Sequence, residues 1–240
     1  MRIAASLKTK AAPYLGVQLE PHRQYLTGLT VRLPLSNPET FIIRASARTI
    51  GNVAALDFNY RSLATAYYEP LSVEWGNRFR LTPEVTLLGQ IDYQAWSAFE
   101  SPQLEIEPPS TTQCAPNCGV QFAPTRYPGF TTRDLFIPRI GIEMGQFRLG
   151  YAYEQSIFKQ DSSSTANNMI DPNKHRMSAG YRFQGTEFFE TDLPWALDFS
   201  ALWTYLERQT VKRSSGELGA PGFEVGGNLF GAGVSLNLSL

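Results

Sequence analysis

Several features that would assign this 240-residue sequence to a common protein class are scarce or missing. Its 21 Lys and Arg residues are balanced by 22 Asp and Glu residues, so no basic field exists to attract nucleic acid. No stretch reaches the roughly 18 consecutive apolar residues that a membrane-spanning helix requires. The first eight residues are too few and too soon charged for a secretory signal. Nucleic-acid-binding proteins and helical membrane proteins are therefore excluded.

Groups that carry catalysis or bind metals are also scarce. The two histidines are His22 and His175, and a hydrolase would need a nucleophile within hydrogen-bond reach of one of them. Ser178 has the opposite strand parity to His175, so the two side chains should point to different faces. Three residues separate Cys114 from Cys118, without a nearby histidine or second cysteine pair, which falls short of a zinc site. We predict no catalytic residue, no metal and no cofactor.

Aromatic residues and glycine are abundant, and apolar and polar residues alternate along most of the chain. There are 15 Phe, 11 Tyr and 4 Trp, and the charged fraction of 18% is below the roughly 25% usual for soluble domains. Alternation with period two is typical of strands with two unlike faces. The pattern predicts an all-β chain of about nine or ten antiparallel strands. These strands are expected around residues 15–20, 29–33, 71–76, 85–94, 136–144, 147–154, 176–183, 195–205 and 230–240.

Two all-β architectures alternate in this way, and the composition of the second face decides between them. A soluble β-sandwich usually presents Lys, Glu and Thr to water. Here the second face is rich in Gly, Ser, Arg and Asp, which suits the lumen of a membrane barrel because small residues relieve crowding on a concave wall. We predict a single domain, residues 1–240, that forms an antiparallel transmembrane β-barrel of the outer-membrane type.

The lengths of the connections support this prediction. Short turns are expected at 21–23, 81–83, 144–146 and, somewhat longer, 185–194, and long loops at 107–131, 156–173 and 212–222. Outer-membrane barrels have short periplasmic turns and long external loops, so we expect the long loops outside the cell. Cys114 and Cys118 both fall in the longest loop, where oxidising conditions favour a disulfide over two free thiols.

Four segments resemble, in order, motifs of the FadL family of outer-membrane transporters for long-chain fatty acids and hydrocarbons. Residues 87–99, ending Tyr-Gln-Ala-Trp-Ser-Ala-Phe, look like the family's Tyr-x-x-Trp-Ser-x-Phe strand. Residues 146–156 resemble its Phe-Arg-x-Gly-x-Ala-Tyr-Asp-x-Ser strand. Residues 170–181 resemble its Pro-Asp-x-x-Arg-x-x-x-Ser-x-Gly-x-Tyr segment, with Asp171 and Pro172 in swapped order. Residues 13–34 look like an earlier family hairpin.

The resemblance spans about Pro13 to Leu240 and corresponds to the second half of the family's sequence. It implies a fourteen-stranded barrel, of which this chain would supply the C-terminal strands. The signal peptide, the N-terminal hatch, the early strands and the kinked gating strand of the family have no counterpart here. We therefore expect part of a longer barrel rather than a reduced one, in the outer membrane of a Gram-negative bacterium.

A fatty-acid transporter needs an apolar groove for the tail and cations for the carboxylate. Our hypothesis is that one or two arginines of lumenal parity bind the head group, while aromatic loop residues help to form a capture groove. The alternative for the arginines is that they pair with Asp92, Glu143, Glu154 and Asp198 across a polar lumen. The candidate ligand-binding residues are Arg139, Arg148, Arg176, Arg182, Phe122, Phe130 and Phe158.

The expected partners are hydrophobic small molecules such as long-chain fatty acids, together with outer-membrane lipids and lipopolysaccharide, around a monomer. A neutral hydrocarbon would also suit an apolar path and would not need an arginine. A structural or adhesive barrel remains a second function, since fold does not determine function, and an outer-membrane lipid hydrolase is a third. Lipid bound in the lumen would favour transport over a purely structural role.

Overall fold

The computed structural model describes residues 11–48, 55–107, 125–127, 130–159, 170–186, 194–212 and 222–238. These residues are almost entirely β-strand, with one short 3-10 helix, η1 (Trp96–Ala98). Within the described ranges, no helix has the length and apolar character needed to cross a membrane.

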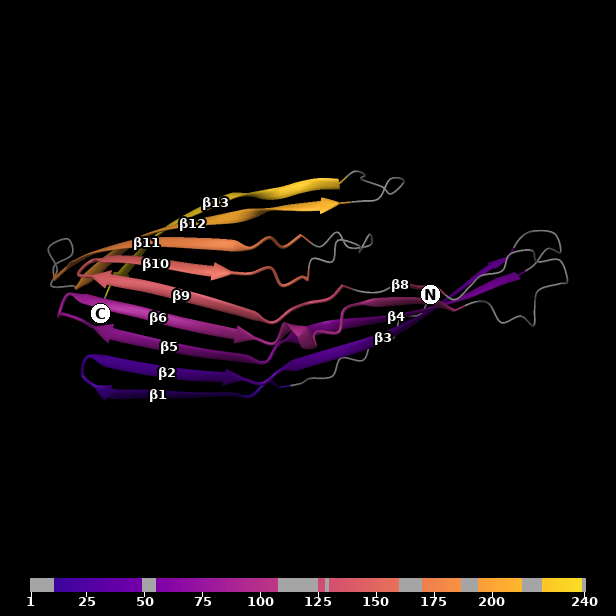
Figure 1. Cartoon of the computed structure of the whole chain (residues 1–240), viewed down its shortest axis with the longest axis horizontal. Helices are drawn as coiled ribbons and strands as arrows, with labels where there is room; N and C mark the ends of the chain where they lie inside the picture. Colours follow the sequence, from indigo (N-terminus) through magenta and orange to yellow (C-terminus); the bar gives the residue numbers. More distant parts are fainter. Residues whose placement is uncertain are drawn as a thin grey trace.

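Nine strands form one continuous antiparallel sheet, which we call the main sheet (Figure 1). Each alternating segment of the sequence falls on one of its strands, so the predicted class is confirmed, and the main sheet has the predicted number of strands. In spatial order the strands are β1 (Tyr14–His22), β2 (Tyr25–Arg32), β5 (Ser72–Arg80), β6 (Val85–Gln94), β9 (Leu135–Met144), β10 (Phe147–Glu154), β11 (Lys174–Gly185), β12 (Trp195–Lys212) and β13 (Gly222–Leu238).

The strand register separates the side chains into a polar face and an apolar face. One cross-strand row joins Leu88, Gly141, Gly150, Ser178, Leu202 and Gly231. The adjacent row, on the other face, joins Ile140, Tyr151, Met177, Trp203 and Phe230. Because each row keeps one parity across the strands, a residue shifted by one position would change face.

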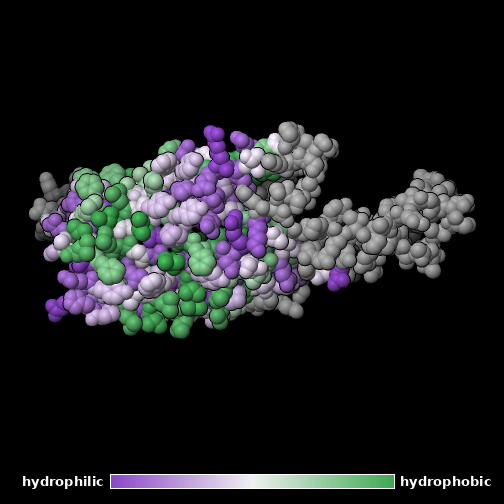
Figure 2. Space-filling view, in the orientation of Figure 1, coloured by the Kyte–Doolittle hydropathy of each residue, from purple (hydrophilic) through white to green (hydrophobic). Residues whose placement is uncertain are grey.

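The apolar face is not covered by a second layer. Ile140 is 64% exposed and Phe230 is 81% exposed, and the only buried hydrophobic residues in the described part of the chain are Leu135 and Ile137. In the view of Figure 2, hydrophobic side chains form surface patches beside hydrophilic ones. A β-sandwich would bury its large apolar residues between two sheets, so this arrangement excludes the sandwich alternative.

The connections of the main sheet leave alternately from its two ends, as the sequence predicts. Those at one end are 23–24, 81–84, 145–146 and 186–194, within one or two residues of their expected positions, and the last of them is as long as the connection 213–221 at the other end. Gly145 has a φ of 58°, which lets the two-residue turn between β9 and β10 close. All long connections leave from the opposite end, which we call the long-connection end (Figure 1).

A second sheet, which the sequence did not predict, extends from the long-connection end (Figure 1). Its order is β3-β4-β7-β8. The strands are β3 (Leu35–Arg48), β4 (Ala55–Glu69), β7 (Gln103–Glu107) and β8 (Thr125–Tyr127). The stretch 107–131, expected as one long loop, therefore begins in β7 and contains β8. Alternation is broken in β3, where Pro38 follows a register shift and Ile42 is followed by Ile43, so the period-two signal fails there.

Candidate ligand-binding site

The four predicted arginines lie on the polar face, and each one has a carboxylate partner. This is the pairing that the sequence offered as the alternative to ligand binding. Opposite charges on neighbouring strands therefore satisfy one another along the polar face. The N–O distances are 2.7 Å for Arg139–Asp92, 3.6 Å for Arg148–Glu143, 3.0 Å for Arg176–Glu154 and 2.7 Å for Arg182–Asp198.

Two of these pairs are held more firmly than the others. Arg182 donates from Nε and Nη2 to the two oxygens of Asp198, at 2.7 and 2.8 Å, which is the strong bidentate geometry. Asp92 is only 3% exposed and also accepts a hydrogen bond from Gln90. Loss of Arg139 would leave that buried carboxylate without its cation, a costly state.

Both faces of the main sheet carry hollows. On the polar face, Arg148 and Asp198 border a hollow of about 500 Å³ whose floor includes Gly180, Ser200 and Gly233. The small residues leave this space open. A larger hollow of about 830 Å³ is lined mainly by residues of the apolar rows, among them Ile140, Tyr151, Met177, Trp203 and Phe230.

Five aromatic rings meet where the long connections leave the main sheet, and we call them the aromatic cluster: Tyr68, Trp96, Phe99, Phe130 and Phe158. The rings of Phe130 and Phe158 are perpendicular with centroids 5.0 Å apart, and Phe99 stacks on Phe130 at 5.8 Å. Tyr68 contacts both Trp96 and Phe99, at 5.5 and 5.1 Å. Such pairs favour each other beyond their area of contact. The structure thus brings together Phe130 and Phe158, which the sequence singled out separately.

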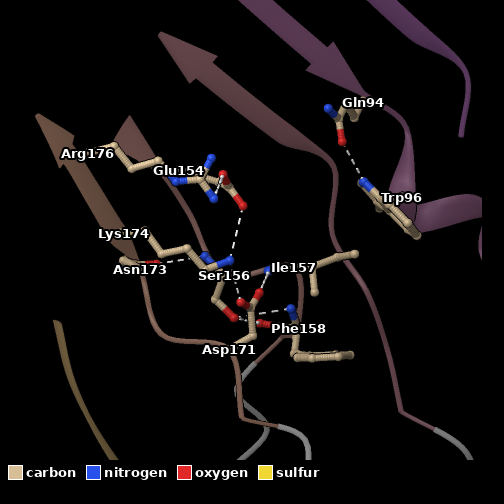
Figure 3. Close-up of polar contacts among 10 residues, drawn as sticks. All are labelled: Gln94, Trp96, Glu154, Ser156, Ile157, Phe158, Asp171, Asn173, Lys174 and Arg176. Carbon is tan, nitrogen blue, oxygen red and sulfur yellow. Dashed lines mark hydrogen bonds and ion pairs between the residues drawn. The ribbon is translucent and has the colours of Figure 1, made fainter. Parts of the chain in front are cut away.

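The helix η1 is fixed to the start of β9 by Asp134. Its carboxylate accepts the Ser97 N–H at 2.9 Å and the Tyr93 hydroxyl at 2.9 Å. Hydrogen bonds from the Ser97 hydroxyl and N–H hold the pKa of Asp134 below its usual range. The Trp96 indole N–H donates to Gln94 at 2.8 Å (Figure 3). The orientation of Trp96 in the aromatic cluster is therefore set by side chains of two neighbouring strands.

Arg133 is a candidate residue that the sequence did not identify. Its Nη2 donates to the Phe158 carbonyl at 3.0 Å, and its buried Nε has no hydrogen-bond partner. In the part of the chain that the structure describes, no carboxylate lies within ion-pair distance of Arg133. Arg133 precedes β9, so strand parity, which selected the other four arginines, gave no signal for it.

Other predicted residues do not join this site. A hydrogen bond of 2.8 Å joins Nδ1 of His175 to the Tyr151 hydroxyl, and Nε2 of His175 lies 2.9 Å from a carboxylate oxygen of Glu207. His175 pairs across the sheet with Tyr153 and Tyr205, whereas Ser178 belongs to the opposite face, as predicted. No cluster of three His, Cys, Asp or Glu side chains occurs among the described residues. Phe122, Cys114 and Cys118 lie outside the described residues.

Comparison with known proteins gives a match in structure but not in sequence. No family model matches the chain, and no curated protein does either. A FadL homologue from Pseudomonas aeruginosa matches with a TM-score of 0.52 and 13% identity, over 93% of this chain and 50% of that one. The CymD monoaromatic hydrocarbon channel matches with a TM-score of 0.47 and 14% identity, over 82% and 46%. The chain spans about half the length of either protein. Its match to the FadL homologue shows that it has the fold of part of a FadL-type outer-membrane β-barrel.

Proposed function

We propose that this chain forms part of the wall of an outer-membrane channel for hydrophobic compounds, and that it carries long-chain fatty acids. The observation that supports a fatty acid is Arg133, a cation without a carboxylate partner in the described chain, placed beside the aromatic cluster. A neutral hydrocarbon would gain nothing from a guanidinium whose buried Nε has no hydrogen-bond partner.

The chemistry of the aromatic cluster and Arg133 matches the two parts of a fatty acid. Burial of the tail against the rings contributes about 0.8 kcal/mol for each CH₂ group. An arginine can hold a carboxylate by two parallel hydrogen bonds, which are stronger than neutral ones because both partners are charged. Arg133 uses Nη2 on the Phe158 carbonyl, and in this proposal the ligand carboxylate accepts from the N–H groups that remain.

The paired arginines are given a secondary role in this proposal. Arg139, Arg148, Arg176 and Arg182 contact a passing head group only by exchanging it for their own carboxylates, so they form the polar wall of the path. Phe122, which lies outside the described residues, stays a proposed ligand-binding residue together with Phe130 and Phe158. The long-connection end faces the outside of a Gram-negative cell, and the assembled channel is a monomer surrounded by outer-membrane lipid and lipopolysaccharide.

Binding of hexadecanoate to the full chain in detergent micelles, measured by isothermal titration calorimetry, tests the proposal. We expect Arg133→Gln to weaken binding by about 10- to 100-fold, since a hydrogen bond to a charged group contributes about 1.5–3 kcal/mol. The control is Arg148→Gln, which removes the longest and most exposed of the four arginine ion pairs and should leave binding within about twofold.

Hexadecanol distinguishes the head group from the tail. We expect it to bind more weakly than hexadecanoate to the unchanged chain and equally to the Arg133→Gln variant. Equal binding of both compounds to the unchanged chain would favour a hydrocarbon channel. An unchanged chain that binds neither compound, and that co-purifies without lipid, would instead favour the structural barrel.

A further inference from the structure

β10 pairs with β9 on one side and with β11 on the other, and the chain stops pairing with β11 where β10 ends. Up to Glu154, β10 pairs with β11, and the last register pair is Glu154 with Lys174. Beyond that point the segment 155–159 runs beside residues 131–133, which lead into β9. Arg133 N–H donates to the Ile157 carbonyl at 2.9 Å, and Lys159 N–H donates to the Thr131 carbonyl at 3.0 Å. These hydrogen bonds place the Phe158 ring against the Phe130 ring.

Three side chains accept hydrogen bonds from the backbone amides of the segment 156–158 (Figure 3). Asn173 Oδ1 accepts the Ser156 N–H at 2.8 Å, and Asp171 Oδ2 accepts the Ile157 N–H at 2.8 Å. The Ser156 hydroxyl then accepts the Phe158 N–H at 3.2 Å. Ser156 is only 1% exposed, so an unsatisfied amide here would cost the full desolvation of that group.

Neighbouring charges orient the two side chains that accept from Ser156 and Ile157. Lys174 Nζ lies 2.6 Å from Asp171 Oδ1 and 3.0 Å from Glu154, which leaves Asp171 Oδ2 free for Ile157 (Figure 3). Asn173 Nδ2 donates to Glu207 at 2.8 Å, which turns its carbonyl oxygen toward Ser156. Both acceptors are therefore oriented by residues outside the segment 156–158, which lowers the entropic cost of ordering that segment.

We propose that Asp171 and Asn173 are positioning residues for ligand binding at the aromatic cluster. They hold the segment 156–158 so that the Phe158 ring lies against Phe130 and the Phe158 carbonyl orients Arg133. The ligand in this inference rests on the proposed function. The claim that Asp171 and Asn173 hold the segment 156–158 depends only on the hydrogen bonds. Neither residue contacts the ligand, so both act through Phe158.

Three variants of the full chain in detergent micelles test the proposal. Asp171→Ala removes the acceptor for Ile157, and Asp171→Asn keeps one acceptor oxygen for Ile157 while its Nδ2 replaces the Oδ1 that lies near Lys174. The control is Glu84→Gln, which alters an exposed carboxylate in the 81–84 connection at the other end of the main sheet. Amide hydrogen exchange at Ile157 and Phe158 reports the segment, and calorimetric titration with hexadecanoate reports the ligand.

We expect Asp171→Ala to speed exchange at Ile157 by at least about tenfold and to weaken hexadecanoate binding by about three- to tenfold, the worth of one hydrogen bond or one aromatic contact. Asp171→Asn should restore both to within about threefold, a rescue that a general loss of stability would not produce. Glu84→Gln should change neither.

Several results would overturn the positioning role. One is unchanged exchange in Asp171→Ala, and another is faster exchange without weaker binding. Equal losses in the Ala and Asn variants would show that charge, rather than the hydrogen bond, matters. If the unchanged chain binds no hexadecanoate, the proposed function fails, and so does the role of Asp171 in ligand binding. Amide hydrogen exchange at Ile157 and Phe158 still decides whether Asp171 holds the segment 156–158.

Discussion

At the scale of single residues, glycines of the main sheet differ in what an added methyl group would meet. A Cβ atom on Gly185 would lie 2.5 Å from Nε1 of Trp195, its cross-strand partner, whereas nothing lies within 4 Å of the same atom on Gly89. We expect Gly185→Ala to lower the free energy of unfolding by about 1–3 kcal/mol, because the indole must move. Gly89→Ala should be neutral or slightly stabilising. Urea unfolding in micelles compares them, and equal midpoints would contradict the prediction.

The contact between Asp134 and η1 is expected to weaken at acid pH. Its folded pKa lies below its ordinary value because of hydrogen bonds from the Ser97 hydroxyl and N–H. Its contribution to stability is therefore complete above the unfolded pKa, about 3.9, and is lost as pH falls through the lower folded pKa. The fluorescence of Trp96 is the difference between the unchanged chain and the Trp96→Phe variant. We expect this fluorescence to stay constant from pH 7 to about 5 and to change below about 4. Asp134→Asn should abolish this acid step, and its persistence would assign the step to another group.

The sequence predicted the residues of the polar face better than those of the aromatic cluster. Strand parity placed Arg139, Arg148, Arg176 and Arg182 on one face and suggested their carboxylate partners, because a period of two reports the facing of a side chain directly. Arg133 and Trp96 lie outside regular strands. Their positions depend on contacts between segments far apart in the chain, which no local pattern encodes.

At the scale of elements, β10, β11 and β12 are joined at the long-connection end by His175. Its ring hydrogen-bonds to Tyr151 on one side and Glu207 on the other, and lies tilted against the Tyr153 ring. His175→Phe keeps the ring but removes both hydrogen bonds. We expect a loss of about 1–3 kcal/mol in the free energy of unfolding, at about 0.5–1.5 kcal/mol for each bond. Amide exchange should rise at the start of β11 and not at its far end, and uniform exchange along β11 would contradict this local role.

Elements were predictable where one face of a strand differed from the other. The nine strands of the main sheet satisfy this condition, since their two faces meet different surroundings. In β3 and β4 the ladder of backbone hydrogen bonds, rather than a clean alternation, defines the strands, and Pro38 follows a register shift. The stretch 87–99 was recognised as a family motif, yet its last residues form η1 rather than strand.

At the scale of the whole molecule, the two edge strands of the main sheet run in the same direction. β1 and β13 are separated by seven strands, and each connection reverses the chain, so both run from the long-connection end toward the short turns. A closed, wholly antiparallel barrel containing this sheet therefore needs an odd number of further strands between these edges. Two copies in one membrane orientation would meet edge to edge in parallel, which argues against pairing of this kind.

The facing of the main sheet can be tested with one pair of substitutions. Ile140 belongs to an apolar row midway along β9, and Leu88 lies opposite Gly141, beside it in register but on the polar face. If the apolar face meets lipid, an arginine at position 140 costs about 2–4 kcal/mol, whereas one at position 88 adds to a polar wall.

We expect Ile140→Arg to reduce several-fold the fraction of the chain that inserts into lipid vesicles on dilution from urea, because transfer of its charge to the bilayer opposes insertion. Leu88→Arg should insert like the unchanged chain. Flotation of the vesicles followed by quantitative immunoblots measures both variants. The reverse order, with Leu88→Arg excluded and Ile140→Arg inserted, would mean that the glycine- and arginine-rich face meets lipid, and the channel wall would then have to be assigned to the opposite side of the main sheet.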